Sequence, residues 1–348
     1  MSVLTDTPLF SVSSATLPDA NVRLDLQAHL AQVDAFMQSL VTSPVLSISQ
    51  PARHVILAGG KRLRAALVLL AANLNRPLAE TGDYRYQPQK AIAVASAVEL
   101  IHAASLVHDD LIDQSPRRRG LETVHSKWFR DAALVGGDYL FALSAEAIAS
   151  SGDIRVLECL GRASVKICEG EIGLVRDVAP LEQVLDAYYA KIAGKTAVLF
   201  EEGLKAAGVI SQATEAQIEA LGRYGHNVGM AFQITDDILD YVGDPIQLGK
   251  PVGGDLRRRQ ITLPLIYAAS DGMPMPLRGT IARLDDGATL AEVEDLLTWV
   301  QSSVGIERSY QASRHFCEAA CRALCEFPSS DCRAALEEAA WSLQLRQT

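Results

Sequence analysis

A long apolar run from Ala91 to Ile112 contains neither Pro nor Gly, and it constrains the fold more than any other stretch. Its composition and length predict a buried helix. The run ends in three carboxylates, Asp109, Asp110 and Asp113. Residues four apart share a helix face, so Asp109 and Asp113 point the same way. Neighbouring carboxylates repel each other and the negative end of the helix dipole, so this pattern indicates a bound hard cation.

The same pattern recurs at the end of a second apolar run, Ile218 to Leu239, where Asp236 and Asp240 stand one turn apart with Asp237 between them. If the two helices face each other, four to six carboxylates converge on one cavity. That charge exceeds what one ion needs. It suits several Mg²⁺ ions shared with a phosphate-bearing substrate, because Mg²⁺ rarely sits in an all-protein cage.

The composition favours helix packing over sheets, since 49% of the 348 residues are hydrophobic and only 6% are aromatic. We expect an all-α protein with a Ser/Thr-rich, disordered tail over residues 1–20 and one helical domain over 21–348. The net charge of −10 argues against nucleic-acid binding. The six cysteines lack disulfide or metal spacing and read as small residues in a reducing compartment. With neither a signal peptide nor an evident membrane span, the expected location is cytoplasmic.

Two cationic segments accompany the aspartates. Gly59-Gly-Lys-Arg-Leu-Arg64 places Lys61 and Arg64 at an expected helix start, where backbone N–H groups also favour an anion. Arg117-Arg-Arg-Gly120 follows the first aspartates, and His102 is nearly in phase with Asp109 on its helix. These residues leave room for two phosphate-bearing ligands, one held through metal and one held directly by cations.

Seven segments, in this order, resemble the signature of the trans-isoprenyl diphosphate synthases, the polyprenyl synthetase family. They are Gly59-Gly-Lys-Arg-Leu-Arg64, Glu99-Leu-Ile-His102, Asp109-Asp-Leu-Ile-Asp113, Arg118-Arg119-Gly120, Gly194-Lys-Thr196, Phe232-Gln-Ile-Thr-Asp-Asp-Ile-Leu-Asp240 and Gly249-Lys-Pro-Val-Gly-Gly-Asp-Leu256. The resemblance is to long-chain members. It implies a single-domain helical bundle around a central cavity, and a prenyltransferase that joins isopentenyl diphosphate head-to-tail to an allylic diphosphate.

The resemblance also implies roles for individual residues. Asp109, Asp113 and Asp236 would hold Mg²⁺, and the catalytic set would add Asp110, Asp237, Asp240 and Lys195. The allylic diphosphate would be bound by Arg118, Lys195, Thr196, Gln233 and Lys250. The diphosphate of isopentenyl diphosphate would be bound by Lys61, Arg64, His102 and Arg119.

Three positions depart from the family pattern. Ala65 stands where Pro is usual, Leu174 stands at a common Gln position, and Arg259-Gln260 replaces the usual Gly-Lys. The missing Lys weakens the expected grip on the allylic diphosphate unless Arg257, Arg258 or Arg259 replaces it.

Product length in this family depends on residues four and five before the first aspartate, which here are the small Ser105 and Ala104. No aromatic side chain closes the path there, and Ile101, about one turn further, is a possible floor. We therefore expect products of C30 to C50, with a C20 product as the alternative.

Three other functions were weighed. A terpene cyclase would need a different second metal motif and no second diphosphate site. A phosphohydrolase built on His108-Asp109 would need further His ligands that the sequence does not supply. A regulatory subunit of a heteromeric synthase would be expected to have lost its aspartates. The resemblance also implies a homodimer formed through helices in the middle of the chain.

Overall fold

The computed structural model describes residues 20–74, 87–172, 181–243, 252–258, 260–284 and 287–344. This part of the chain is helical apart from two short antiparallel strands, β1 (Arg117–Arg118) and β2 (Leu121–Glu122). The expectation of an all-α fold is confirmed. The expected tail over residues 1–20 lies almost wholly outside the described residues.

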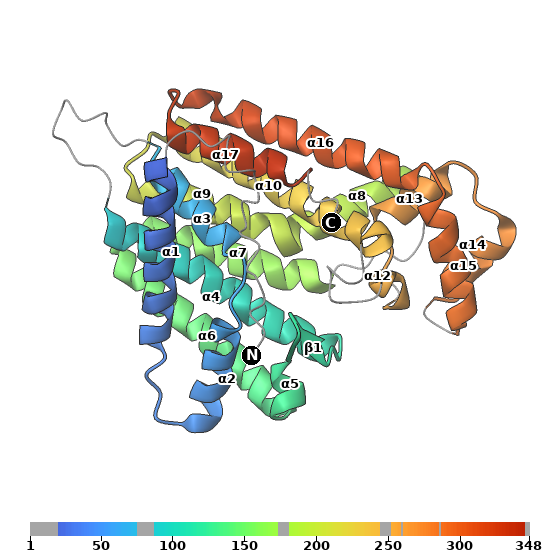
Figure 1. Cartoon of the computed structure of the whole chain (residues 1–348), viewed down its shortest axis with the longest axis horizontal. Helices are drawn as coiled ribbons and strands as arrows, with labels where there is room; N and C mark the ends of the chain where they lie inside the picture. The colour runs from blue at the N-terminus through green and yellow to red at the C-terminus, as the bar shows by residue number, and fades with distance from the viewer. Residues whose placement is uncertain are drawn as a thin grey trace.

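Figure 1 shows how the helices are arranged. They are α1 (Ala20–Leu40), α2 (Leu46–Leu57), α3 (Leu63–Ala72), α4 (Pro88–Ile112), α5 (Val124–Lys127), α6 (Arg130–Ser151), α7 (Ile154–Ile172), α8 (Leu181–Ile192), a π-helix (Ala193–Ala197), α9 (Val198–Ile210), α10 (Glu215–Val242), α12 (Gly254–Arg257), α13 (Leu263–Ser270), α14 (Met275–Ala282), α15 (Leu290–Gln301), α16 (Gly305–Ala323), a 3₁₀ turn (Leu324–Glu326) and α17 (Asp331–Ser342).

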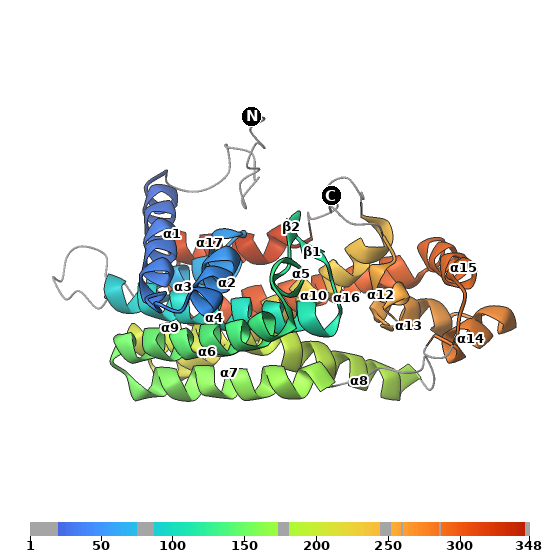
Figure 2. The ribbon, with the colours of Figure 1, turned by 90° about the horizontal axis from the view of Figure 1, so that it is seen from below.

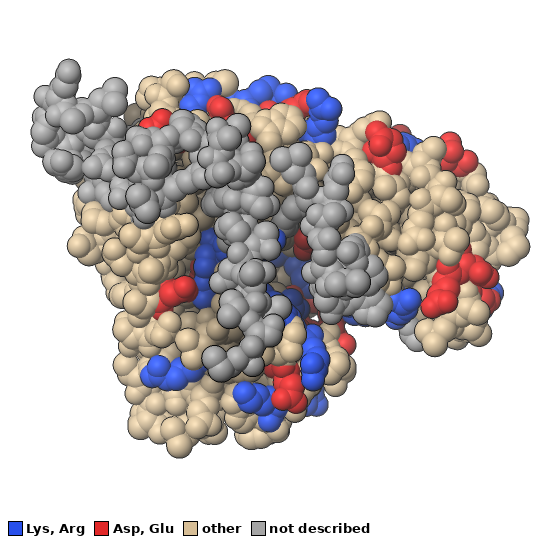
Figure 3. All heavy atoms as spheres, viewed as in Figure 1, with Lys and Arg blue, Asp and Glu red and all other residues tan. Residues whose placement is uncertain are grey.

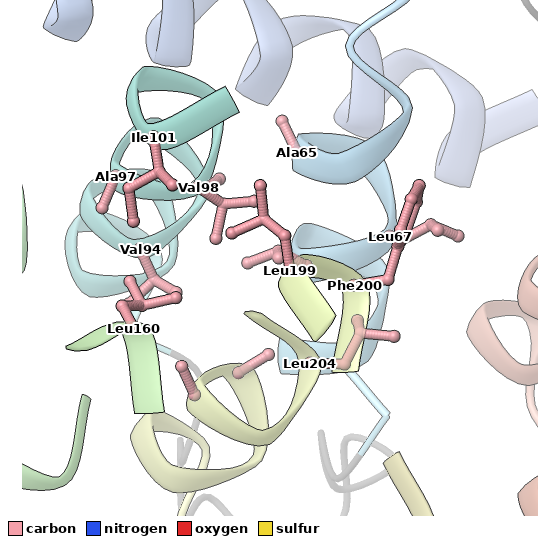
Figure 4. Packing of buried hydrophobic residues seen from close by; sticks show 14 of the residues in the cluster. Ala65, Leu67, Val94, Ala97, Val98, Ile101, Leu160, Leu199, Phe200 and Leu204 are labelled. Carbon is pink, nitrogen blue, oxygen red and sulfur yellow. The ribbon is translucent and has the colours of Figure 1, made fainter. Parts of the chain in front are cut away.

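Helix α4 is the centre of the larger hydrophobic core. It packs against α1, α3, α6 and α9, and most of its residues are buried. Figure 4 shows its side chains opposite those of α3, α7 and α9. Burying each large aliphatic side chain contributes about 1.5–3 kcal/mol. This packing holds the C-terminal end of α4, and therefore its aspartates, in a fixed place.

Helix α10 is the second long element and packs against α9 and α16. Its start is set by a capping box, because Thr214 accepts the backbone N–H of Gln217 and the Gln217 side chain accepts that of Thr214. A second hydrophobic cluster joins α10 to α13, α15 and the end of α8. The aspartates at the end of α10 therefore rest on a core of their own.

Two helical stretches are interrupted. Helix α5 is separated from α6 because Phe129 is fully extended (φ −169°, ψ 169°). The π-helix stands between α8 and α9, and its wider turn shifts the faces of α8 relative to those of α9.

Helices α4 and α6 are long and apolar enough to cross a membrane by length and composition alone. In the fold, 78% of the apolar window of α4 and 50% of that of α6 are buried inside the protein. A core helix passes the same test of length and composition. Figure 2 shows α6 and α7 side by side along one face, with α4 on the other side of α6 from α7.

Close packing of α9 on α10 depends on Gly225, because a Cβ there would lie 2.5 Å from the carbonyl oxygen of Phe200. We predict that Gly225→Ala lowers the free energy of unfolding by about 1–3 kcal/mol. Gly161→Ala is the control, since a Cβ on that helical glycine meets nothing within 4 Å. It should raise stability by about 0.5–1 kcal/mol. Urea unfolding followed by circular dichroism measures both, and equal effects would contradict the packing argument.

Candidate active site

A cavity of about 320 Å³ lies between the C-terminal ends of α4 and α10. We call it the carboxylate cavity, because six aspartates line it: Asp109, Asp113, Asp236, Asp237, Asp240 and Asp255. The two aspartate motifs therefore converge, as their spacing predicted. Asp110 does not line this cavity; its carboxylate accepts two bonds from Arg118 Nε, at 2.9 and 3.0 Å.

Burial makes the negative charge at this site unfavourable. It raises the pKa of Asp109 to about 6, with nearby Glu171 adding to the effect and Lys195 opposing it. It raises the pKa of Asp237 to about 8, and Asp255 adds to that effect. A cation placed between these groups would relieve this cost.

The second and third carboxylates of α10 are held by protein donors. Asp237 accepts hydrogen bonds from Tyr188 Oη at 2.7 Å and from Gln233 Nε2 at 2.8 Å. Asp240 accepts the backbone N–H of Asp255 at 2.8 Å. Gln233 also accepts the Thr196 hydroxyl at 2.8 Å, which ties the π-helix to α10. No sequence motif marks Tyr188, since its contact with Asp237 depends on how α8 packs.

The π-helix carries Lys195 and Thr196 into the site. It is clamped between two glycines, because a Cβ on Gly170 of α7 would overlap the backbone of Lys195 and one on Gly229 of α10 would overlap Ala197. Lys195 Nζ lies 2.5 Å from Glu171 and 3.5 Å from Asp109. A π-helix inserted between α-helices is a frequent feature of functional sites.

A second cavity, of about 830 Å³, adjoins the first. We call it the cationic cavity. Its basic residues are Lys61, Arg62, Arg64, His102, Arg118, Arg119 and Lys195. The two cavities share a wall formed by Leu106, Asp109, Arg118, Lys195, Thr196, Gln233 and Asp236. On the face drawn in Figure 3, basic and acidic atoms gather together near the middle of the molecule.

Arg64 is the most deeply placed of these cations. Burial lowers its pKa to about 10, and its guanidinium lies over Phe200 at 4.4 Å and Phe232 at 5.6 Å. Its buried Nε finds no hydrogen-bond acceptor among the described residues. An unsatisfied buried donor is unfavourable, so this atom favours an anionic ligand in the cavity. The pKa of His102 is also well below its usual value, because the ring is buried near four arginines.

The loop that carries Lys61 and Arg64 is fixed by Arg62 and Glu99, two motif residues to which the sequence assigned no role. Arg62, in the left-handed conformation (φ 48°), bonds Glu99 at 3.3 Å and Asp34 at 2.9 Å. Glu99 also accepts the backbone N–H of Ala65 at 3.1 Å. Glu99 is a charged residue inside the otherwise apolar run of α4, and this position was the sequence signal for a buried ion pair. Arg119 donates to the carbonyl of Gly59, and a Cβ on Gly60 would overlap its guanidinium.

The donor set fits a hard cation shared with a ligand. In the described ranges, three or more His, Cys, Asp or Glu side chains do not approach closely enough to enclose a metal by themselves. The available donors are carboxylate oxygens on opposite walls of one cavity. Magnesium suits such a site, because it keeps waters and takes the remaining oxygens from substrate phosphates.

The residues expected to set product length lie on α4. Ser105 lines the cationic cavity, whereas Ala104 and Ile101 are fully buried in the core beneath it. Lys250 and Leu174, as well as Arg259, lie outside the described residues. Of the neighbouring positions, Arg258 and Gln260 line the carboxylate cavity. Arg257 instead bonds Val252 and lies 3.5 Å from Glu294.

Comparison with known proteins decides the family, because the polyprenyl synthetase model matches residues 46–296. The chain belongs to this family. It is a prenyltransferase, and the expectation drawn from the seven motifs is confirmed.

Three relatives span nearly the whole chain. Heptaprenyl diphosphate synthase component 2 of Geobacillus stearothermophilus is 38% identical over 90% of this chain and 95% of its own. The crystal structure of a decaprenyl diphosphate synthase from Rhodobacter capsulatus matches with a TM-score of 0.82 and 33% identity, covering 95% of this chain and all of the other. The crystal structure of a polyprenyl synthase from Caulobacter crescentus, complexed with calcium and isoprenyl diphosphate, matches with a TM-score of 0.83 and 34% identity. The match covers 94% of this chain and 97% of the other.

Proposed function

We propose that this enzyme condenses isopentenyl diphosphate with an allylic diphosphate, head-to-tail and with Mg²⁺, to give a trans-polyprenyl diphosphate of C30 to C50. The observation that carries the proposal is the pair of adjoining cavities, one lined by carboxylates and one by cations. Relatives that make heptaprenyl and decaprenyl diphosphate support the product class.

In this proposal, Asp109, Asp113 and Asp236 are the metal ligands. All three line the carboxylate cavity, and the relative from Caulobacter crescentus holds calcium with its diphosphate. Asp110, Asp237 and Asp240 support them, since each already accepts bonds from protein donors. They orient Arg118, Gln233 and the start of α12.

The allylic diphosphate is assigned to the carboxylate cavity, with Arg118, Lys195, Thr196, Gln233 and Lys250 as its contacts. Arg258 supplies the charge missing at Gln260, because both side chains line this cavity while Arg257 is engaged elsewhere. The diphosphate of isopentenyl diphosphate is assigned to the cationic cavity, with Lys61, Arg64, His102 and Arg119. The unsatisfied Arg64 Nε supports this assignment.

The chemistry follows from this placement. Breaking the allylic C–O bond puts negative charge on the departing diphosphate. Bound divalent ions would supply positive charge to it. Lys195 and Arg118 stabilise the same charge from the wall common to both cavities. The homoallylic double bond then attacks the allylic carbon, and the released diphosphate accepts the proton. Phe232 and Ile167, which line the cationic cavity, help to keep water from the carbocation.

The assembly is proposed to be a homodimer formed through α6 and α7. These helices expose several large apolar side chains: Leu134, Val135, Ile154, Leu157 and Val165. Covering such side chains with a second chain removes apolar surface from water, which is favourable. The relative named as a component 2 raises a second candidate, a heteromeric synthase in which a different subunit pairs with this chain.

We also propose one folded domain over residues 21–348 and a cytoplasmic location.

Incubation with Mg²⁺, isopentenyl diphosphate and each of three allylic primers tests the activity. We predict a polyprenyl product with one dominant length. Asp109→Ala and Asp236→Ala should each lower turnover on the order of a hundredfold or more, because they remove metal ligands. The control is Asp131→Ala, an exposed residue in the first turn of α6. Near-wild-type turnover with either variant would refute the metal assignment, and cyclic hydrocarbons would indicate a cyclase.

Ser105→Phe tests the path of the growing chain. We predict a shorter dominant product, because the ring would stand in the cavity wall where the chain descends along α4. Ser105→Ala keeps the space open and should leave product length unchanged. The measurement is chromatography of the dephosphorylated products. If Ser105→Phe leaves the product length unchanged, the proposal that α4 lines the path of the growing chain is wrong.

Sedimentation or size-exclusion chromatography tests the assembly. We predict a species of twice the 37.5 kDa chain mass. Leu157→Glu should dissociate it, because a buried charge at the interface is unfavourable. Met275→Glu, at a more exposed apolar position on α14, is the control. A monomer that elongates primers only after a second polypeptide is added would favour the heteromer.

A further inference from the structure

Four basic residues line the carboxylate cavity, and three of them already have carboxylate partners. Arg118 is bonded to Asp110, Lys195 to Glu171 and Arg258 to Asp255. The fourth is Lys191, for which the described part of the chain provides no ion pair or hydrogen bond. None of the sequence motifs includes it.

Lys191 occupies the last turn of α8, four residues before Lys195, and is partly buried. Its side chain lines the carboxylate cavity on one side. On the other side it lines an outer groove between α7 and α9 that includes Val165 and Lys166. Burial, together with the charge of Lys195, lowers the pKa of Lys191. An anion beside the Lys191 ammonium would raise this pKa again, because it stabilises the charged form.

A purely structural role is poorly supported, because the nearby carboxylates are satisfied by other groups. Asp237 accepts from Tyr188 and Gln233, and Asp255 is paired with Arg258 at 2.5 Å. Placing a desolvated ammonium beside Lys195 is unfavourable without a ligand. The position therefore suits a ligand that brings more negative charge than the metal ions neutralise.

We propose that Lys191 is a further contact for the diphosphate held in the carboxylate cavity, both in the allylic substrate and in the released pyrophosphate. This inference rests on the proposed function and adds a residue to it. The ammonium comes from α8, whereas Arg118 comes from β1. With Lys195 it forms a pair of cations on one wall, where charge builds up on the departing diphosphate.

The test compares Lys191→Met, which keeps the length of the side chain and removes its charge, with Lys191→Arg. We expect Lys191→Met to raise the KM for the allylic diphosphate about tenfold, and to weaken inhibition by Mg²⁺-pyrophosphate by a similar factor, as for the loss of one charged contact. The KM for isopentenyl diphosphate should stay unchanged. Lys191→Arg should restore most of the loss.

Lys166→Met is the matched control, because Lys166 lines the outer groove but not the carboxylate cavity. It should leave the KM for the allylic diphosphate, the KM for isopentenyl diphosphate and the inhibition by Mg²⁺-pyrophosphate unchanged. Lower thermal stability of Lys191→Met with unchanged allylic KM and pyrophosphate inhibition would overturn the proposal and leave a structural role. Equal losses for both substrates would also overturn it. A wild-type enzyme without condensation activity would instead refute the proposed function, and direct pyrophosphate binding by calorimetry would still test Lys191.

Discussion

The mutual repulsion of buried carboxylates at the ends of α4 and α10 is the constraint on which the site depends. Six aspartates line one small cavity, and burial raises the pKa values of Asp109 and Asp237 far above those of exposed carboxyl groups. Two hydrophobic cores hold the helices that carry them, so the carboxylates cannot separate. Under the proposed function, this unfavourable repulsion is relieved when divalent cations and a phosphate ligand enter the cavity.

The surrounding structure reduces this repulsion without removing it. Arg118, Lys195 and Arg258 each pair with a carboxylate, and Tyr188 and Gln233 donate to Asp237. Lys195 reaches its place because glycines on α7 and α10 let the π-helix approach both helices closely. The cations at the edge of the cavity are therefore set by backbone contacts, which makes them rigid partners for an incoming anion.

The sequence predicted the features that depend on local spacing. The convergence of the aspartates, the all-α class and the family followed from two helical motifs and the order of seven segments. Tyr188 and Lys191 were missed because their neighbours come from helices distant in the sequence. Glu99 was quoted within a motif, but its bonds to Arg62 and to the backbone of Ala65 depend on how α3 meets α4. The break at Phe129 and the π-helix are also tertiary effects, since neither Pro nor any strong local signal marks them.

The two cavities differ in the charge of the side chains that line them. Carboxylates favour a diphosphate that arrives with divalent ions, because a bare polyanion would be repelled. The cationic cavity has Glu99 paired with Arg62, so its remaining cations can bind a diphosphate without metal. Under the proposed function this difference sorts two chemically similar substrates. Their carbon ends then meet at the wall that the cavities share, where Asp109, Lys195 and Asp236 face both ligands. In this proposal, the charged side chains bind only the diphosphate groups, which lie away from the reacting carbon atoms. Binding both diphosphates nevertheless places the ionised allylic carbon next to the attacking double bond.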